Sequence, residues 1–284
     1  DIISTMKYFF YIVRCSDDSL YSGITTDLKR RLNEHNLDGK KGAKYLRAKR
    51  PVKLVYSEKF KNRNTALVRE AEVKKLPKSK KELLIIKDHF KKVDKKIHNV
   101  MKGMDFEKWK KVIREEEDYF INLTRSIIGQ QLSGKAAATI IGRFENLFPK
   151  KKIDAKYLLK LSDEILRGVG MSYSKASFIK DLAKKTLNGE ISFKNIKKLK
   201  DEEIINHLTK VKGIGPWTAE MFLMFSLARP NIFSHKDLGL NRAIQKLYGF
   251  KNLPTIKQAE KIISKWEPFK SYASFALWES LNNR

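Results

Sequence analysis

The sequence of 284 residues contains one cysteine, Cys15. A single thiol excludes an intramolecular disulfide, a cysteine-based zinc cluster and a four-cysteine iron–sulfur cluster. This scarcity of cysteine is typical of a reducing, cytosolic setting.

Long hydrophobic runs are also missing from the sequence. No window approaches the roughly 18 consecutive apolar residues of a membrane-spanning helix. The opening DIISTM lacks the basic start and apolar core of a secretory signal. We therefore expect a soluble, cytoplasmic protein that does not bind membranes. Because the chain begins with Asp1 and Met6 follows, residues 1–5 are either an upstream extension or a cloning remnant.

Acidic residues are few relative to basic ones. The chain has 32 Asp and Glu against 60 Lys and Arg, which gives a formal net charge of +28, and the excess occurs in the first 86 residues as well as in the remainder. Such a charge favours a polyanionic partner, because basic side chains bind phosphates and release counterions. The alternative is the solvated surface of a lysine-rich protein, but such a protein usually balances more of its charge with acid. Nucleic acid is therefore the favoured partner.

The first part of the chain has the pattern of a small α/β domain. Three segments rich in aromatic and β-branched residues are typical of strands, and two segments have helical spacing of their apolar residues. In chain order they are YFFYIVR, LYSGIT, DLKRRLNEHN, PVKLVYSEKF and NTALVREAEVKKL. The SDDS between the first two indicates a β-hairpin turn. The order ββαβα predicts a domain over residues 6–86.

The rest of the chain has a different composition. Residues 87–103 are dense in lysine with sparse apolar positions, so we interpret them as a basic linker that is partly helical. Residues 104–284 show helical periodicity almost throughout, with helices expected at about 105–115, 117–129 and 192–198 among others, and no convincing strand. The sequence therefore predicts two domains, a small α/β domain and an all-α domain, and 42% apolar residues suffice for two cores.

The stretch VKGIGPW, at residues 211–217, lies between two predicted helices. Gly213 and Gly215 permit left-handed backbone angles and close approach of another molecule, and Pro216 suits the first turn of a helix. Exposed amides at such a turn can bind a phosphate. A dinucleotide fingerprint needs a preceding strand and G-x-G-x-x-G, and neither is present. Two interpretations of this stretch remain: a turn that binds a DNA backbone, and a simple break between two helices.

Four segments in register then point to a known family. VKGIGPWTAEMF, SHKDLGLNRAI, IIGQQLSGKAA and GMSYSKASFI together resemble the helix-hairpin-helix DNA glycosylase superfamily, most closely the 3-methyladenine-DNA glycosylase II family, over about 104–284. The resemblance implies a monomer that binds double-stranded DNA, flips an alkylated purine and hydrolyses its N-glycosidic bond without a cofactor. It also implies that the Gly213–Gly215 hairpin holds a DNA phosphate, with a monovalent cation on its carbonyls.

Asp237 matches the catalytic aspartate of that family. A fixed carboxylate stabilises the positive charge that develops on the sugar, or orients the attacking water. The alternative is an N-cap of the following helix, and one residue can do both. Relatives that also cleave the strand carry a lysine where this chain has Trp217, so the resemblance implies a monofunctional glycosylase.

Trp217 and Trp278 match positions that line the base pocket in the family. An aromatic pocket suits a flipped, cationic alkylpurine; the alternative is ordinary packing between helices. Gln130 and Gln131 lie between two predicted helices, where relatives place side chains toward the gap left by the flipped nucleotide. For these two residues the alternative is a solvated loop.

The N-terminal segments FYIVRCSDDSLYSGITTDLKRRLNEHN and GAKYLRAKRPVKLVYSEKF resemble the GIY-YIG nuclease domain, in particular its small single-domain branch, over about 7–85. Both family motifs are degraded, to FYI and YSG. By position, Tyr11 and Tyr21 face one another across the hairpin, Arg31 and His35 share a face of the next helix, and Glu70 lies on the later helix.

The resemblance implies roles in phosphodiester hydrolysis. A tyrosine acts as the base, Arg31 contacts the phosphate, His35 lies one turn beyond it, and Glu70 holds Mg²⁺ or Mn²⁺. The alternatives are packing roles for the tyrosines, a surface role for Arg31, and an exposed Glu70 paired with Lys74. Glu72 is a rival metal ligand.

The sequence thus predicts a nucleoid-associated DNA repair enzyme in which a glycosylase follows a nuclease-like domain that incises DNA. Two other functions stay open. One is a catalytically silent protein that binds damaged DNA, and the other is a structure-specific nuclease targeted by an inactive glycosylase fold.

Overall fold

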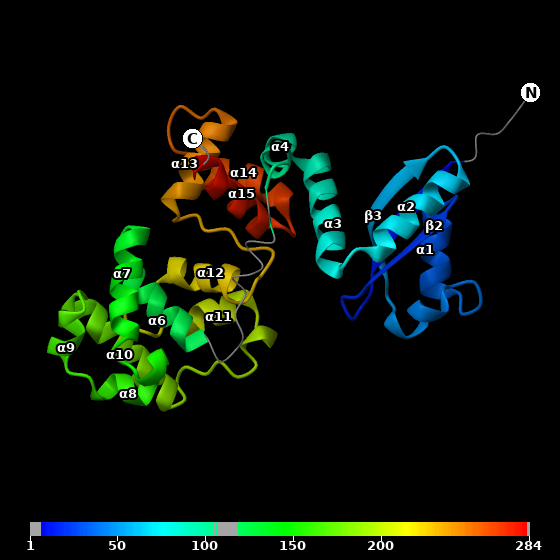
Figure 1. Ribbon diagram of the computed structural model, residues 1–284. Coiled ribbons are helices and arrows are strands. Elements are labelled where there is room, and N and C mark those ends of the chain that lie inside the picture. The colour runs from blue at the N-terminus through cyan, green and yellow to red at the C-terminus, as the bar shows by residue number, and fades with distance from the viewer. Residues whose placement is uncertain (1–6, 105, 107–118, 283–284) are drawn as a thin grey trace, which may run out of the picture. The chain divides into compact units, whose positions relative to one another are not determined.

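The computed structural model describes residues 7–104, 106 and 119–282. The chain folds as two compact units that divide between His98 and Asn99 (Figure 1). This division lies inside the segment that was expected as a linker. The predicted limits at 6–86, 87–103 and 104–284 stay predictions.

The first unit is built on a three-stranded antiparallel sheet. Strands β1 (Tyr8–Arg14), β2 (Leu20–Thr25) and β3 (Lys53–Phe60) lie in the order β2-β1-β3. Helix α1 (Leu28–Leu37) and a 3₁₀ helix (Lys44–Lys49) connect β2 to β3, and α2 (Arg63–Lys75) follows. The predicted ββαβα order is therefore confirmed.

The lysine-dense segment is helical. It begins within α3 (Lys78–Val93), which buries Ile85, Ile86 and Phe90, and continues through α4 (Lys95–Met101). Near the start of α3, Glu82 accepts two hydrogen bonds from the guanidinium of Arg14, at the end of β1. Helix α3 is thus anchored to the sheet and is not a free linker.

The second unit is helical throughout its described residues. The segments expected as helices at 105–115 and at the start of 117–129 lie largely outside the described residues. The described α-helices are α6 (Tyr119–Gly129), α7 (Gly134–Glu145), α8 (Ala155–Lys160), α9 (Asp163–Gly168), α10 (Tyr173–Leu187), α11 (Asp201–Leu208), α12 (Pro216–Phe225), α13 (Leu238–Tyr248), α14 (Ile256–Ile263) and α15 (Lys270–Asn282). The helix predicted at 192–198 is only a 3₁₀ turn, Ile196–Lys198.

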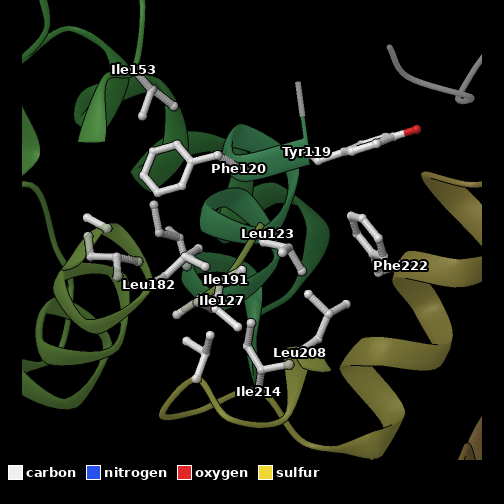
Figure 2. Packing of buried hydrophobic residues seen from close by; sticks show 14 of the residues in the cluster. Tyr119, Phe120, Leu123, Ile127, Ile153, Leu182, Ile191, Leu208, Ile214 and Phe222 are labelled. Atoms are coloured by element: carbon white, nitrogen blue, oxygen red, sulfur yellow. The ribbon is translucent and has the colours of Figure 1, made fainter. Parts of the chain in front are cut away.

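Helix α6 lies at the centre of the main core of this unit. Its buried Leu123 and Ile127 lie between Leu182 of α10 and Phe222 of α12 (Figure 2). The ring of Tyr119 meets that of Phe222 edge-on, with centroids 5.3 Å apart. This packing fixes α6 against α12, and both helices contribute to the site described next. Among the described residues, no helix has the length and apolar character needed to cross a membrane.

Candidate active sites in the two units

The hairpin between α11 and α12 depends on Gly213. Its φ of +79° is a left-handed conformation, and a Cβ there would lie 2.1 Å from the ring of Phe178. Gly215 is different. It caps α12 with a φ of −91°, and a Cβ there would meet nothing within 4 Å. Gly213 is therefore required by the fold, whereas Gly215 leaves open space in front of the helix.

Gln130 and Gln131 occupy different environments. The side-chain amide of Gln130 donates to the Gly213 carbonyl at 2.8 Å and to the Thr218 hydroxyl at 3.3 Å, so it braces the hairpin. Gln131 is exposed and has a positive φ of 58°. Lys175 of α10 donates to the carbonyls of Ile128 and Gln130, and burial lowers its pKa. The loop is thus held on two sides, and Gln131 is its exposed tip.

Asp237 sits at the centre of a network of three donors. Its Oδ1 accepts from the backbone N–H of Leu240 at 2.8 Å, as the N-cap of α13, and from the indole N–H of Trp278 at 3.1 Å. Its Oδ2 accepts from the indole N–H of Trp217 at 2.9 Å. The predicted N-cap is confirmed. The same carboxylate, 9% exposed, is also fixed by both predicted pocket tryptophans.

A cavity of about 290 Å³ lies between α6 and α12. Asn122 and Ser126 line it from α6, and Thr218, Met221 and Phe225 line it from α12. Neither tryptophan lines this cavity, but Trp278 stacks on Phe225 with ring centroids 5.7 Å apart. None of these lining residues was predicted from the sequence. The spacing Thr218, Met221, Phe225 on one face of the helix after the hairpin was the available signal.

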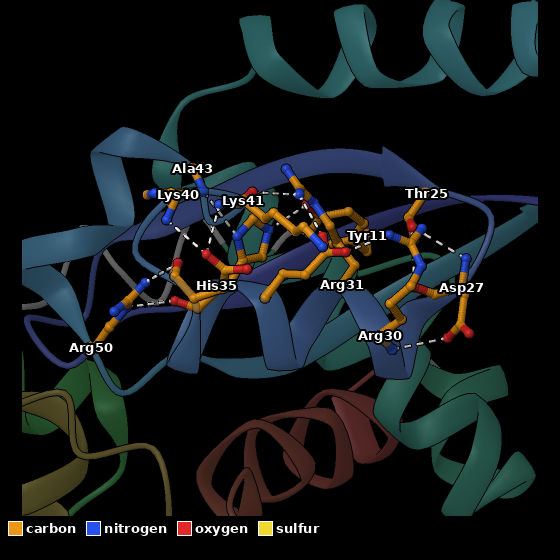
Figure 3. Close-up of polar contacts among 12 residues, drawn as sticks. Tyr11, Thr25, Asp27, Arg30, Arg31, His35, Lys40, Lys41, Ala43 and Arg50 are labelled. Atoms are coloured by element: carbon orange, nitrogen blue, oxygen red, sulfur yellow. Dashed lines mark hydrogen bonds and ion pairs between the residues drawn. The ribbon is translucent and has the colours of Figure 1, made fainter.

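In the first unit, Tyr11 and His35 form a buried pair (Figure 3). The hydroxyl of Tyr11 lies 2.7 Å from Nε2 of His35. The backbone N–H of Ala43 donates to Nδ1 of His35 at 3.3 Å, so the neutral imidazole carries its proton on Nε2 and donates it to Tyr11. A Cβ at Gly23 would lie 2.7 Å from the Tyr11 hydroxyl. The glycine of YSG therefore makes room for the phenol.

The surroundings shift the pKa of both rings. Burial raises the pKa of Tyr11 to about 12, although the nearby Arg31 guanidinium opposes this change. Burial, with the charges of Arg31 and Arg50, lowers the pKa of His35 to about 4. His35 is therefore neutral at physiological pH.

Tyr11 and Tyr21 were expected to face one another across the hairpin, but they do not lie opposite each other in the sheet. In the antiparallel register Tyr11 lies opposite Gly23, and Tyr21 lies opposite Val13. The two tyrosines meet instead at His35, because the Tyr21 ring contacts the imidazole edge-on at 5.7 Å. Both side chains thus belong to one cluster, through His35 rather than through each other.

Arg31 and Glu70 lie near this cluster. Arg31 donates to Glu34 at 2.8 Å and to the Lys41 carbonyl at 2.9 Å. Glu70 does pair with Lys74, at 3.0 Å, but its side chain is only 15% exposed and its charge acts on Tyr11. The rival Glu72 pairs with Arg69 and is 59% exposed. Glu70 is therefore the carboxylate of the cluster. Over the described residues, no three His, Cys, Asp or Glu side chains gather as a metal site.

Comparison with known proteins matches both units. The model of the HhH-GPD superfamily of base excision DNA repair proteins matches residues 124–268, and that of the GIY-YIG catalytic domain matches residues 7–82. The Bacillus subtilis protein YfjP is 33% identical over 165 residues, which are 56% of this chain. The match spans 58% of the length of YfjP. Another Bacillus subtilis protein, the UPF0213 protein YazA, is 47% identical over 83 residues, 29% of this chain and 82% of YazA.

A solved structure supports the helical fold. The Schizosaccharomyces pombe 3-methyladenine DNA glycosylase in complex with abasic DNA superimposes with a TM-score of 0.62 and 28% identity, over 69% of this chain and 96% of that chain. The chain therefore belongs to the HhH-GPD superfamily of base excision DNA repair proteins, and a GIY-YIG domain precedes that region.

Proposed function

We propose that the second unit is a DNA glycosylase that hydrolyses the N-glycosidic bond of alkylated purines of the 3-methyladenine type. The observation that carries this proposal is the carboxylate of Asp237, fixed by three donors, one of which, Trp278, stacks on Phe225 in the wall of the cavity. The name of the Schizosaccharomyces pombe neighbour agrees with it. The partner would be double-stranded DNA with a damaged base, bound by a monomer.

The chemistry follows from where the charge develops. Breaking the bond between sugar and base creates positive charge on the sugar, and a preorganised carboxylate stabilises that charge. The bonds from Trp217, Trp278 and Leu240 hold both oxygens of Asp237 in place. An alkylated purine is already cationic, so it leaves without a proton from the protein.

The cavity between α6 and α12 is our candidate for the base pocket. A base must leave the stack before a protein can act on it, and stacking between apolar and aromatic side chains holds it. Met221, Phe222 and Phe225 supply such a lining. Aromatic faces also attract a cationic base.

The second unit would leave the DNA strand intact. A lyase needs an amine nucleophile, and Trp217 stands where lyase relatives carry lysine. Its indole instead donates to Asp237. The hairpin would hold a DNA phosphate through amides near Gly215. A monovalent cation there would share the Gly213 carbonyl with Gln130, which is compatible with the two lone pairs of that oxygen.

The test of this function is the release of free base. Methylated duplex DNA is incubated with the wild type and with Asp237→Asn, which keeps the size of the side chain. The proposal predicts that the wild type releases 3-methyladenine and that the substitution abolishes release. A wild type that binds methylated DNA but frees no base would instead support a silent damage-binding protein.

For the first unit we propose metal-dependent hydrolysis of DNA phosphodiester bonds. The observation that favours it is the cluster of Tyr11, His35, Arg31 and Glu70. Deprotonated Tyr11 would take a proton from the attacking water, and the Nε2–H of His35 would stabilise the phenolate. Arg31, charged at any working pH, would bind the phosphate oxygens.

Glu70 would hold the metal ion. Mg²⁺ commonly binds one or two carboxylates together with water and phosphate oxygens, so a single well-placed carboxylate fits Mg²⁺ or Mn²⁺. When bound, such an ion neutralises charge on the phosphate and the leaving oxygen. The carboxylate of Glu70 is already oriented by Lys74.

This nuclease has its own test. A nick near the abasic site should require Mg²⁺ or Mn²⁺ and should be lost in Glu70→Gln, while base release continues. Nicking that persists in Glu70→Gln would exclude the assignment. Metal-dependent cutting of branched DNA without base release would point to the structure-specific nuclease.

A further inference from the structure

A second feature of the first unit lies beside Arg31. An open cavity of about 310 Å³ is lined by Tyr8, Thr25, Thr26, Arg30, Arg31 and Arg63. These residues come from the start of β1, the end of β2, the first turn of α1 and the start of α2. Three arginines from two helices thus line one cavity.

Few ion pairs among the described residues neutralise the arginines of this cavity. Glu34 bridges two of the arginines, with Oε1 to Arg30 and Oε2 to Arg31. Within the described part of the chain, Glu34 is the only carboxylate in an ion pair with either of them, and Arg63 forms no ion pair. In the structure as described, a single carboxylate is therefore ion-paired with members of this group of three arginines.

Such a cluster costs stability, because like charges repel. Glu34 reduces that cost by pairing with one nitrogen of each of two guanidinium groups. Planar guanidinium groups bind phosphate oxygens through paired hydrogen bonds. The hydroxyls of Thr25 and Thr26 add groups of the kind that contact DNA backbones.

We propose that this arginine cavity binds the DNA backbone phosphate next to the one that is cut. The proposal rests on the nuclease function of the first unit. Arg31 belongs to the catalytic cluster and to the cavity, so a strand with its scissile phosphate at Arg31 continues into the cavity. Arg63 and Arg30 then hold the neighbouring phosphate and set the register of the strand in the site.

The first experiment needs neither metal nor cleavage. Thymidine 3′,5′-bisphosphate is titrated in EDTA into the full chain with ¹⁵N-labelled arginine, and the Nε–H signals of Arg30 and Arg63 are followed. Both signals should shift. Arg63→Ala should weaken binding by about tenfold, the effect of one charged hydrogen-bonding group. Arg47→Ala, an exposed arginine outside the cavity, should leave binding unchanged.

The second experiment locates the phosphate. Single-turnover cleavage is measured on oligonucleotides with one neutral methylphosphonate at each linkage around the cut. At one linkage next to the cut, the methylphosphonate should lower the cleavage rate of the wild type as much as the Arg63→Ala substitution does on unmodified DNA. The same methylphosphonate should not lower the cleavage rate of Arg63→Ala any further. The melting temperature of Arg63→Ala should not fall, because a repelling charge has been removed.

The outcomes separate the two proposals. Bisphosphate binding through Arg63 without cleavage in Mg²⁺ or Mn²⁺ would contradict the nuclease and leave the cavity assignment standing. Normal cleavage with an unshifted Arg63 signal would overturn the cavity assignment and leave the nuclease standing, if the methylphosphonate and Arg63→Ala also lower the cleavage rate independently at every linkage.

Discussion

Trp217 shows how one side chain can serve both structure and chemistry. Its indole N–H binds Asp237, and the residue is still 38% exposed, so its ring also faces solvent. A purely structural tryptophan would be expected to bury more of its ring. We infer that its N–H positions the carboxylate while its exposed ring is left for DNA or base.

Replacing Trp217 with Phe keeps an aromatic ring and removes the N–H. Asp237 would lose the donor on Oδ2 and keep the two on Oδ1. We expect kcat for base release to fall by at least about tenfold, since one hydrogen bond to a charged group contributes about 1.5–3 kcal/mol. The measurement is single-turnover base release, with melting temperature as the control. An unchanged rate would show that the indole does not position Asp237.

Tyr11 and His35 give a pH prediction for the nuclease. The base is active when deprotonated, and the pKa of Tyr11 is about 12, so only a small fraction is phenolate at neutral pH. The rate of nicking in Mg²⁺ should therefore rise about tenfold per pH unit from roughly pH 7 to 9. His35, with a pKa of about 4, stays neutral over this range, so its titration does not change the slope of the pH–rate profile. Tyr21→Phe should keep the slope, and Tyr11→Phe should abolish cutting. A rate that does not change with pH would contradict Tyr11 as the base.

At the scale of elements, the hairpin between α11 and α12 separates two roles of glycine. Gly213 has a left-handed backbone and touches Phe178, so the fold itself requires it. Gly215 has ordinary backbone angles and open space at its Cβ position. A DNA backbone bound close to this position would account for a residue without a side chain there.

The two alanine substitutions should therefore act differently. Gly213→Ala should lower the melting temperature, because a left-handed alanine is strained and its methyl group overlaps a ring. Gly215→Ala should leave the melting temperature unchanged and weaken binding to abasic duplex DNA. Thermal unfolding and fluorescence anisotropy measure the two effects. Unchanged DNA affinity in Gly215→Ala would remove the hairpin from the DNA interface.

The sequence predicted elements well where local rules decide. Strand alternation, the SDDS turn and the Gly-Ile-Gly hairpin are local signals, and those elements are present. Asp237 was predicted both as a cap and as a catalytic residue, and its cap geometry is confirmed. Residues 87–103 were interpreted as a linker because their apolar residues are sparse, yet Phe90 and Ile97 find a buried surface that only tertiary packing creates.

Other features depend on contacts between distant residues. Strand register decided that Tyr11 lies opposite Gly23, and the position of Tyr21 within its motif did not reveal this. The indole groups that donate to Asp237 belong to Trp217 and Trp278, which are 20 and 41 positions away from it in the sequence. The arginine cavity needs Arg63 to lie beside Arg31, which requires the whole sheet. No local pattern contains this information.

In the molecule as a whole, the two activities that we propose suit successive steps. Base removal produces an abasic site, and phosphodiester hydrolysis can then cut the strand there. The positive charge of both parts suits one polyanionic substrate. The account assigns each step to a different unit, with Asp237 for the first and Glu70 for the second.

One measurement tests this division most directly. A duplex with a single alkylated purine and a labelled strand is incubated with the wild type in EDTA, and the strand is analysed before and after hot alkali. The account predicts an intact strand that breaks at the lesion only after alkali, because base removal needs no metal and Trp217 replaces the lysine of a lyase. A strand already broken in EDTA, before alkali, would contradict it.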